Sequence, residues 1–97
     1  QNVIVDFTAS WCMNCQYNKN VVLESKRIAE LIEEKDIVPL MADITTHNQG
    51  AETLLLQLGS RSVPFLAVFS ATNPQSPVIM RDLLNKRKLA EVLEELP

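Results

Sequence analysis

Two cysteines, Cys12 and Cys15, form a C-x-x-C pair and are the residues of this chain best suited to chemistry. A cysteine thiolate is a nucleophile and a metal ligand, and two cysteines at this spacing can also form and break a disulfide. Three uses are therefore open: a structural zinc site, a pair of inert core cysteines, or a redox-active dithiol. Structural zinc is bound by four ligands, and beyond the pair this chain offers only His47 and carboxylates.

The position of the pair favours the redox-active dithiol. The apolar run at residues 3–8 predicts a buried strand, and a segment of helical composition at 12–22 follows it. Cys12 then lies at the N-terminus of a helix, where unpaired backbone N–H groups and the helix dipole stabilise a thiolate. Cys15 lies one turn further on, within bonding reach of Cys12. We therefore expect Cys12 to attack a partner disulfide and Cys15 to resolve the mixed disulfide.

Asp6 interrupts the apolar strand six residues before Cys12 and allows two interpretations. It is either a polar residue near a strand end, solvated or hydrogen-bonded, or a desolvated carboxylate with a raised pKa. In the second case it lies under the dithiol and moves the proton of Cys15.

Trp11 and Pro64 each allow a structural and a functional interpretation as well. Trp11 either packs beside the site, or shields the site and provides a docking surface. Pro64 is tolerated as the first residue of a strand. Alternatively, a cis Val63–Pro64 bond faces the cysteines and leaves backbone groups of Val63 free to pair with an extended substrate chain. Only ~5–6% of X–Pro bonds are cis, so the dipeptide alone does not decide.

The elements that must position these residues alternate between short apolar runs and helical periodicities, which is typical of a layered α/β domain. We expect strands at 3–8, 37–43, 65–69 and 78–81, and the last two strands to form a hairpin across a turn at 70–77. After the helical segment at 12–22, a second helix is expected to begin at Ser25, its N-cap residue. Another follows a capping box at Thr46 to Gln49 and ends at Gly59, and the last spans about 86–96.

Two finer predictions follow from the same pattern. Pro39 removes a backbone donor and moves the strand at 37–43 toward an edge of the sheet. In the helical segment at 12–22 we expect Tyr17, Val21 and Val22 to be the buried contacts. The predicted order is β-α-β-α-β-β-α.

Composition limits the function classes. The 97 residues are 46% hydrophobic with a net charge of −3, which indicates one compact soluble domain over 1–97. Nine basic against twelve acidic residues give no electrostatic footprint for nucleic acid or an anionic membrane. No signal segment and no apolar run of membrane-spanning length occurs. Because the chain starts at Gln1 and runs straight into an apolar stretch, we expect a piece of a larger protein.

The segments 5–7 (VDF), 9–15 (ASWCMNC) and 62–65 (SVPF) together resemble the thioredoxin superfamily along essentially the whole chain. Within that superfamily, the segment 11–23 (WCMNCQYNKNVVL) resembles the C-terminal periplasmic domain of DsbD-type thiol:disulfide interchange proteins. The resemblance implies a three-layer α/β/α sandwich with a mixed four-stranded sheet in the order 4-3-1-2, in which strand 3 is antiparallel.

The resemblance also implies roles for individual residues. Cys12 would be the attacking cysteine, Cys15 the resolving cysteine, Asp6 the buried acid and Pro64 the cis-proline. The predicted partner-binding residues are Trp11, Met13, Asn14, Val63 and Pro64. DsbD-type domains often have an acid four residues after the second cysteine, whereas this chain has Lys19, which would favour a nearby thiolate.

The implied function is a protein-disulfide reductase that needs no cofactor beyond the redox-active Cys12–Cys15 disulfide, and no metal. Its partners would be disulfide-bearing protein domains, with electrons supplied by a transmembrane domain of the same parent chain. The implied location is the periplasmic face of a bacterial inner membrane, with no membrane insertion by this domain itself. A disulfide oxidant or isomerase on the same fold is an alternative, and so is a non-catalytic interaction or metal-binding module.

Overall fold

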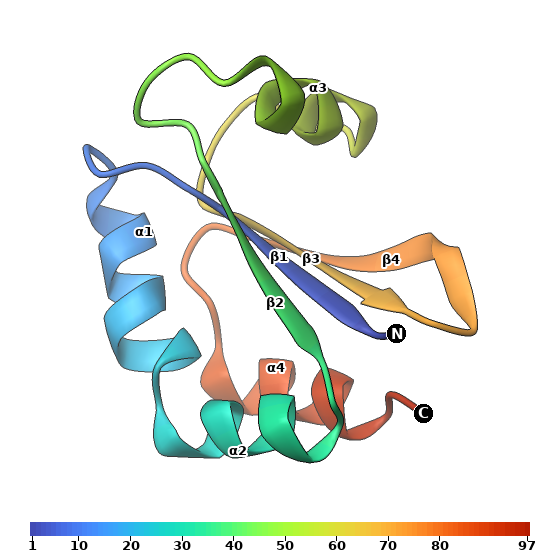
Figure 1. Ribbon diagram of the computed structural model, residues 1–97. Helices are drawn as coiled ribbons and strands as arrows, with labels where there is room; N and C mark the ends of the chain where they lie inside the picture. Colours follow the sequence, from blue (N-terminus) through green and yellow to red (C-terminus); the bar gives the residue numbers. More distant parts are fainter.

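A four-stranded sheet lies between helices in the computed structural model, which describes all 97 residues (Figure 1). The elements in chain order are β1 (Val3–Thr8), α1 (Met13–Tyr17), the π-helix η1 (Asn18–Leu23), α2 (Lys26–Glu34), β2 (Val38–Asp43), α3 (Gln49–Gln57), β3 (Phe65–Ser70), β4 (Asn73–Arg81) and α4 (Lys86–Glu94). Helix α1 runs directly into η1. The predicted order of strands and helices is confirmed, with the first helical segment divided into an α part and a π part.

The strand order across the sheet is β2-β1-β3-β4. Strand β1 pairs in parallel with β2, and β3 is antiparallel to both β1 and β4. Read from the other edge, this is the predicted order 4-3-1-2, with strand 3 antiparallel as expected. Pro39 lies in the edge strand β2 opposite Ile4, and its side chain is exposed. An edge strand tolerates the missing backbone donor of proline.

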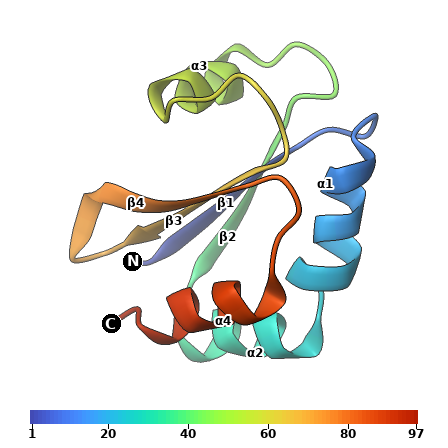
Figure 2. The same ribbon diagram turned by 180° about the vertical axis from the view of Figure 1, so that it is seen from behind.

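Helices cover both faces of the sheet, as the predicted three layers require. Helix α3 lies alone on one face, and α2 and α4 lie on the other (Figures 1 and 2). The side chains of β1 alternate between the two faces, because successive residues of a strand point in opposite directions. The apolar core under α3 consists of Val5, Phe7, Leu55, Phe65 and Ala67. The larger core on the other face consists of Ile4, Val22, Ile28, Leu31, Ile37, Leu66, Val68, Leu84, Leu89, Leu93 and Leu96.

Strand β4 is longer than predicted. It begins at Asn73 rather than at residue 78, because Ser70 pairs with Asn73 across a turn of only two residues. The prolines and polar residues that favour a long turn at 70–77 lie instead in the exposed half of an edge strand, where proline is tolerated. The predicted hairpin between the last two strands is present.

The start of α3 also differs from the prediction. The N-cap is Asn48, not Thr46: its side-chain oxygen accepts from the N–H of Ala51 at 3.2 Å. The carboxylate of Glu52 accepts in turn from the N–H of Asn48 at 2.8 Å. These reciprocal bonds satisfy two donors at the helix start, so the helix begins two residues later than the spacing from Thr46 suggests.

The predicted end of α3 is confirmed. Gly59 has a φ of 93°, which a side chain would disfavour. Its N–H donates to the carbonyl of Leu56, and the N–H of Ser60 donates to that of Leu55. This pair of bonds is the Schellman arrangement that ends many helices. Ser25 is the N-cap residue of α2 as predicted, although its hydroxyl donates to the carbonyl of Val22 instead of capping the helix.

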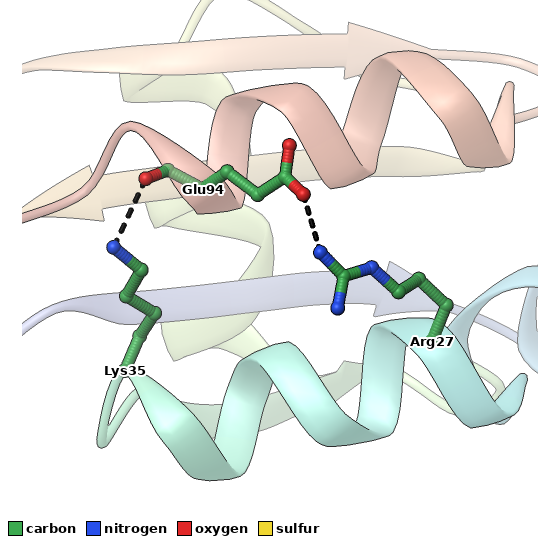
Figure 3. A network of polar contacts seen from close by, with 3 residues as sticks. All are labelled: Arg27, Lys35 and Glu94. Atoms are coloured by element: carbon green, nitrogen blue, oxygen red, sulfur yellow. Dashed lines mark hydrogen bonds and ion pairs between the residues drawn. The ribbon is translucent and has the colours of Figure 1, made fainter.

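Helices α2 and α4 are joined at their exposed sides (Figure 3). Arg27 forms an ion pair with the carboxylate of Glu94, and the ammonium of Lys35 donates to the backbone carbonyl of Glu94 at 2.9 Å. Both partners of the ion pair are about half exposed, so the pair adds only about 0.5 kcal/mol to stability. Helix α4 is held mainly by its buried leucines. None of the helices combines the length and the apolar character needed to cross a lipid bilayer.

Candidate active site

Cys12 and Cys15 lie where the chain leaves the carboxyl end of β1 and enters α1. Cys12 is the N-cap residue of α1, and Cys15 lies within the helix, as the sequence predicts. The two sulfurs form a disulfide, and the Cα atoms are 5.2 Å apart. A two-residue spacer at a helix start therefore brings both sulfurs together within a single turn.

The turn that delivers Cys12 to the helix is held by hydrogen bonds from three segments. The carbonyl of Ala9 accepts from the N–H of Cys12 at 3.2 Å and from the side-chain amide of Gln16 at 3.0 Å. The N–H of Ser10 donates to the hydroxyl oxygen of Thr45 at 2.8 Å, and that hydroxyl donates to the carboxylate of Asp43. The loop after β2 thus fixes the backbone immediately before the dithiol.

The two cysteines differ in exposure and in hydrogen bonding. Cys12 is 8% exposed and Cys15 only 1%. The N–H of Cys15 donates to the sulfur of Cys12 at 3.1 Å. In the reduced protein a donor directed at this sulfur favours the thiolate form of Cys12. The geometry therefore suits Cys12 as the nucleophile and Cys15 as the shielded second thiol.

Val63 and Pro64 approach the dithiol from the segment before β3. The Val63–Pro64 peptide bond is cis, as the functional interpretation of Pro64 expects, and its role in substrate binding stays a prediction. The side chain of Val63 packs against the small cluster formed by Ala9, Cys12 and Cys15. The backbone N–H and C=O of Val63 form no hydrogen bond within the protein. An extended chain lying beside the disulfide could pair with these two groups.

Asp6 is partly buried on the face of β1 that also carries Ile4. It lines a cavity of about 260 Å³ between β1, β2 and η1. Lys19 and Glu24 line the same cavity, and neither cysteine does. Burial raises the pKa of Asp6 from its usual 3.8 to about 6, against the opposing charge of Lys19. Asp6 is thus a partly desolvated carboxylate that can accept a proton at neutral pH, and its role toward Cys15 stays a prediction.

The remaining predicted partner-binding residues lie on the surface around Cys12. Trp11 is 63% exposed, Met13 is 86% exposed, and Asn14 is exposed as well. The exposure of Trp11 agrees with the docking interpretation, and its role in partner binding stays a prediction. Large apolar side chains left in water beside a reactive disulfide are typical of a protein-binding surface.

The burial of the helical segment after the cysteines was predicted incorrectly in part. Tyr17 and Val21, expected to be buried, are both about half exposed, whereas Val22 is buried as expected. The buried face is instead made by Cys15, Asn18 and Val22. The spacing of these three residues, i, i+3 and i+7, could have identified this face. A polar Asn18 on it was missed because its hydrogen-bond partners lie more than 60 residues away.

No group of three or more His, Cys, Asp or Glu side chains is placed to hold a metal ion. His47 lies far from the dithiol in sequence and pairs with the carboxylate of Glu52 at 2.9 Å, just before the start of α3. His47 is therefore a loop residue beside the start of α3. The reactive group that the structure shows is the Cys12–Cys15 disulfide.

Comparisons with known proteins agree with this geometry. A family model described as Thioredoxin-like matches residues 1–71. The chain is 29% identical over 76 residues to the thiol:disulfide interchange protein DsbD of Ralstonia nicotianae. That match covers 78% of this chain but only 12% of the relative's length.

Solved structures show the same fold. The crystal structure of the reduced DsbD C-terminal domain of Neisseria meningitidis aligns with a TM-score of 0.75 at 20% identity, over 99% of this chain and 81% of that one. The solution structure of a thioredoxin from Thermus thermophilus aligns with a TM-score of 0.77 at 16% identity, over 98% and 72%.

A sheet flanked by helices on both faces, with a disulfide at a strand-to-helix junction and a cis-proline beside it, defines the thioredoxin fold class. The chain belongs to the thioredoxin-like family. The Cys12–Cys15 disulfide provides the reactive group that thiol:disulfide exchange requires.

Proposed function

We propose that this domain is a protein-disulfide reductase and that the single turn holding Cys12 and Cys15 carries the reaction. The observation behind the proposal is the asymmetry of the pair. Cys12 borders an exposed surface and accepts a hydrogen bond from the N–H of Cys15, whereas the sulfur-bearing side chain of Cys15 is enclosed. This asymmetry suits one cysteine for attack on a partner and the other for resolution.

The reaction proceeds in two exchanges. The Cys12 thiolate attacks one sulfur of a partner disulfide, forms a mixed disulfide and releases the other partner sulfur as a thiolate. Cys15 then loses its proton to the carboxylate of Asp6 and attacks the Cys12 sulfur, which releases the second partner thiolate. The domain ends as the Cys12–Cys15 disulfide, and the partner has gained two electrons and takes up two protons, one of them by way of Asp6.

Partner binding would use the surface that surrounds Cys12. An extended partner segment would pair with the free backbone groups of Val63, beside Pro64, while Trp11, Met13 and Asn14 would contact its side chains. The exposed apolar area and the two unpaired backbone groups support this arrangement.

The oxidised domain must be reduced again before each turnover. We propose that residues 1–97 form one domain of a longer membrane protein, in which a transmembrane domain supplies the electrons. The domain would act on disulfide-bearing protein domains at the periplasmic face of a bacterial inner membrane. This part of the proposal rests on the DsbD relative, of which the chain matches only 12%.

The test uses the two single-cysteine variants and insulin as a protein disulfide. Cys12→Ser should abolish insulin reduction, because the attacking sulfur is lost. Cys15→Ser should leave the first exchange intact and accumulate a mixed disulfide, visible by mass spectrometry. Efficient reduction by the Cys12→Ser chain would overturn the proposal.

A redox titration distinguishes a reductant from an oxidant on the same fold. A reductant should have a midpoint near that of thioredoxin, about −270 mV, whereas an oxidant should lie near that of DsbA, about −120 mV.

A further inference from the structure

Asn18 is a buried polar side chain that the reaction above does not use. It lies three residues after Cys15, on the same buried face of the helical segment, and is only 2% exposed. Enclosing a side-chain amide is unfavourable unless the amide finds hydrogen-bond partners. Its position next to the dithiol therefore raises the question of which partners it binds.

Both ends of the Asn18 side chain are bonded to one distant loop, the segment between β4 and α4. The amide nitrogen donates to the backbone carbonyl of Asp82 at 2.9 Å, and the amide oxygen accepts from the N–H of Leu84 at 2.9 Å. Because the two bonds run to backbone groups two residues apart, they fix the distance and the orientation of that loop relative to the dithiol helix.

The same loop is bonded to the cis-proline. The N–H of Asp82 donates to the carbonyl of Pro64 at 3.2 Å. Asp82 has a φ of 60°, a conformation uncommon outside glycine, and the hydrogen bonds at its N–H and its C=O hold it there. Asp82 thus links Asn18 on one side to Pro64 on the other.

We propose that Asn18 is a positioning residue. Through Asp82 it fixes the position of the Val63–Pro64 segment relative to the helix that carries Cys12 and Cys15. A partner chain paired with Val63 is thereby presented with its disulfide sulfur at Cys12. The inference rests on the proposed thiol:disulfide exchange. It assigns to Asn18 an effect on partner presentation, and none on the reactivity of Cys12 itself.

The chain contains a matched control in Asn2, which is 5% exposed. Its side chain likewise bridges two backbone groups, with its amide nitrogen donating to the carbonyl of Pro97 at 3.0 Å and its oxygen accepting from the N–H of Ala71 at 2.8 Å. Asn2 precedes β1, whereas the dithiol follows it, and the N-terminus and α1 lie at opposite ends of that strand (Figures 1 and 2). A purely structural role should make the two asparagines equivalent.

The experiment compares Asn18→Leu and Asn2→Leu, which keep a similar side-chain size and remove both hydrogen bonds. Each reduced chain is assayed with insulin, whose chain must be bound, and with bis(2-hydroxyethyl) disulfide, which is too small to use the Val63 backbone. For Asn18→Leu we expect kcat/KM for insulin to fall roughly five- to tenfold, the effect of losing a buried hydrogen-bonded link. The rate with the small disulfide should change less than twofold. Asn2→Leu should leave both rates unchanged.

Asn18→Ala is the second variant, for the case in which the leucine prevents folding. It removes both hydrogen bonds, to Asp82 and to Leu84, and introduces neither charge nor bulk beside the dithiol. The same selective loss with insulin is expected. Equal slowing with both substrates, or behaviour like that of Asn2→Leu, would overturn the inference. A wild-type chain that reduces the small disulfide but not insulin would overturn the proposed function, and the inference with it.

Discussion

The two faces of the sheet are built on different principles, although the same strands supply both. On the α3 face the buried side chains of the core are apolar, and Phe7 and Phe65 meet edge to face with ring centroids 5.6 Å apart. The guanidinium of the exposed Arg81 lies over the Phe65 ring. The opposite face has the larger apolar core, but it also encloses the carboxyl of Asp6 and the amide of Asn18. Only this second face carries polar groups next to the element that holds the cysteines.

The α3 face contributes mainly to stability, whereas the opposite face also holds groups that can take part in the reaction. An apolar interface stabilises the fold in proportion to the area it removes from water, and this contribution does not depend on pH. A buried carboxyl destabilises the fold when it is charged, yet it is the group that can take a proton near neutral pH. The α3 face should therefore respond to mutation in its stability alone, and the opposite face in its pH dependence and its exchange rate.

The largest effect expected from this comparison is on the α3 face. Leu55→Ala removes a side chain that is 2% exposed and should lower the free energy of unfolding by about 2–5 kcal/mol, through lost burial and the cavity left behind. Urea unfolding measures the change. At 25 °C the folded fraction should still reduce insulin at the wild-type rate.

Leu56→Ala provides the control. The side chain of Leu56 is 51% exposed, so its removal should lower the free energy of unfolding only slightly. A Leu55→Ala chain that unfolds normally but exchanges slowly would contradict the assignment of this face to stability.

Asp6→Asn should have a smaller effect on stability, and of the opposite sign. Because the pKa of Asp6 is raised from 3.8 to about 6, the folded chain holds this proton more tightly than the unfolded chain does. The free energy of unfolding should thus decline as the pH rises from 3.8 through about 6, by up to about 3 kcal/mol, and stay lower above that range. The asparagine variant lacks this decline, so it should be the more stable chain at pH 8 and equal to wild type near pH 3.

The same variant should be slower in exchange, by roughly a hundredfold if Asp6 acts as the base for Cys15. Urea unfolding of the oxidised chains from pH 3 to 8 and insulin reduction at pH 7 measure the two effects. Glu24→Gln is the matched control, since Glu24 lines the same cavity but is exposed. Loss of stability at pH 8 in Asp6→Asn would contradict the desolvation argument.

The features that could be predicted from the sequence are those fixed by nearby residues. The apolar runs define β1 and β3, and the C-x-x-C pair at the end of the first run places the dithiol at a helix start. The sheet order and the cis Val63–Pro64 bond followed from the resemblance to thioredoxins, since neither periodicity nor the dipeptide decides them.

The features that escaped prediction depend on partners far away in the chain. Asn18 is buried because the loop at 82–84 satisfies its amide, and no local pattern contains that information. The first half of β4 is a strand because β3 pairs with it, despite its turn-forming residues. Asn48, rather than Thr46, begins α3 because its own side chain and that of Glu52 satisfy the first donors.

The smallest expected effect is that of Lys19, which influences the Asp6 face of the sheet through its charge alone. Lys19 lines the same cavity as Asp6, and its charge lowers the pKa of that carboxyl in opposition to burial, although the two side chains form no ion pair within 4.0 Å. Lys19→Met should therefore raise the pKa of Asp6 above about 6, and Lys19→Arg should not. NMR titration of the Asp6 side-chain carboxyl carbon in the oxidised chain measures this pKa directly.

The pH profile of insulin reduction by Lys19→Met should move to higher pH, because Asp6 must be ionised to accept the proton of Cys15. The pH profile of Leu55→Ala should keep its wild-type position. An unchanged Asp6 titration in Lys19→Met would mean that burial alone sets the pKa of this carboxyl.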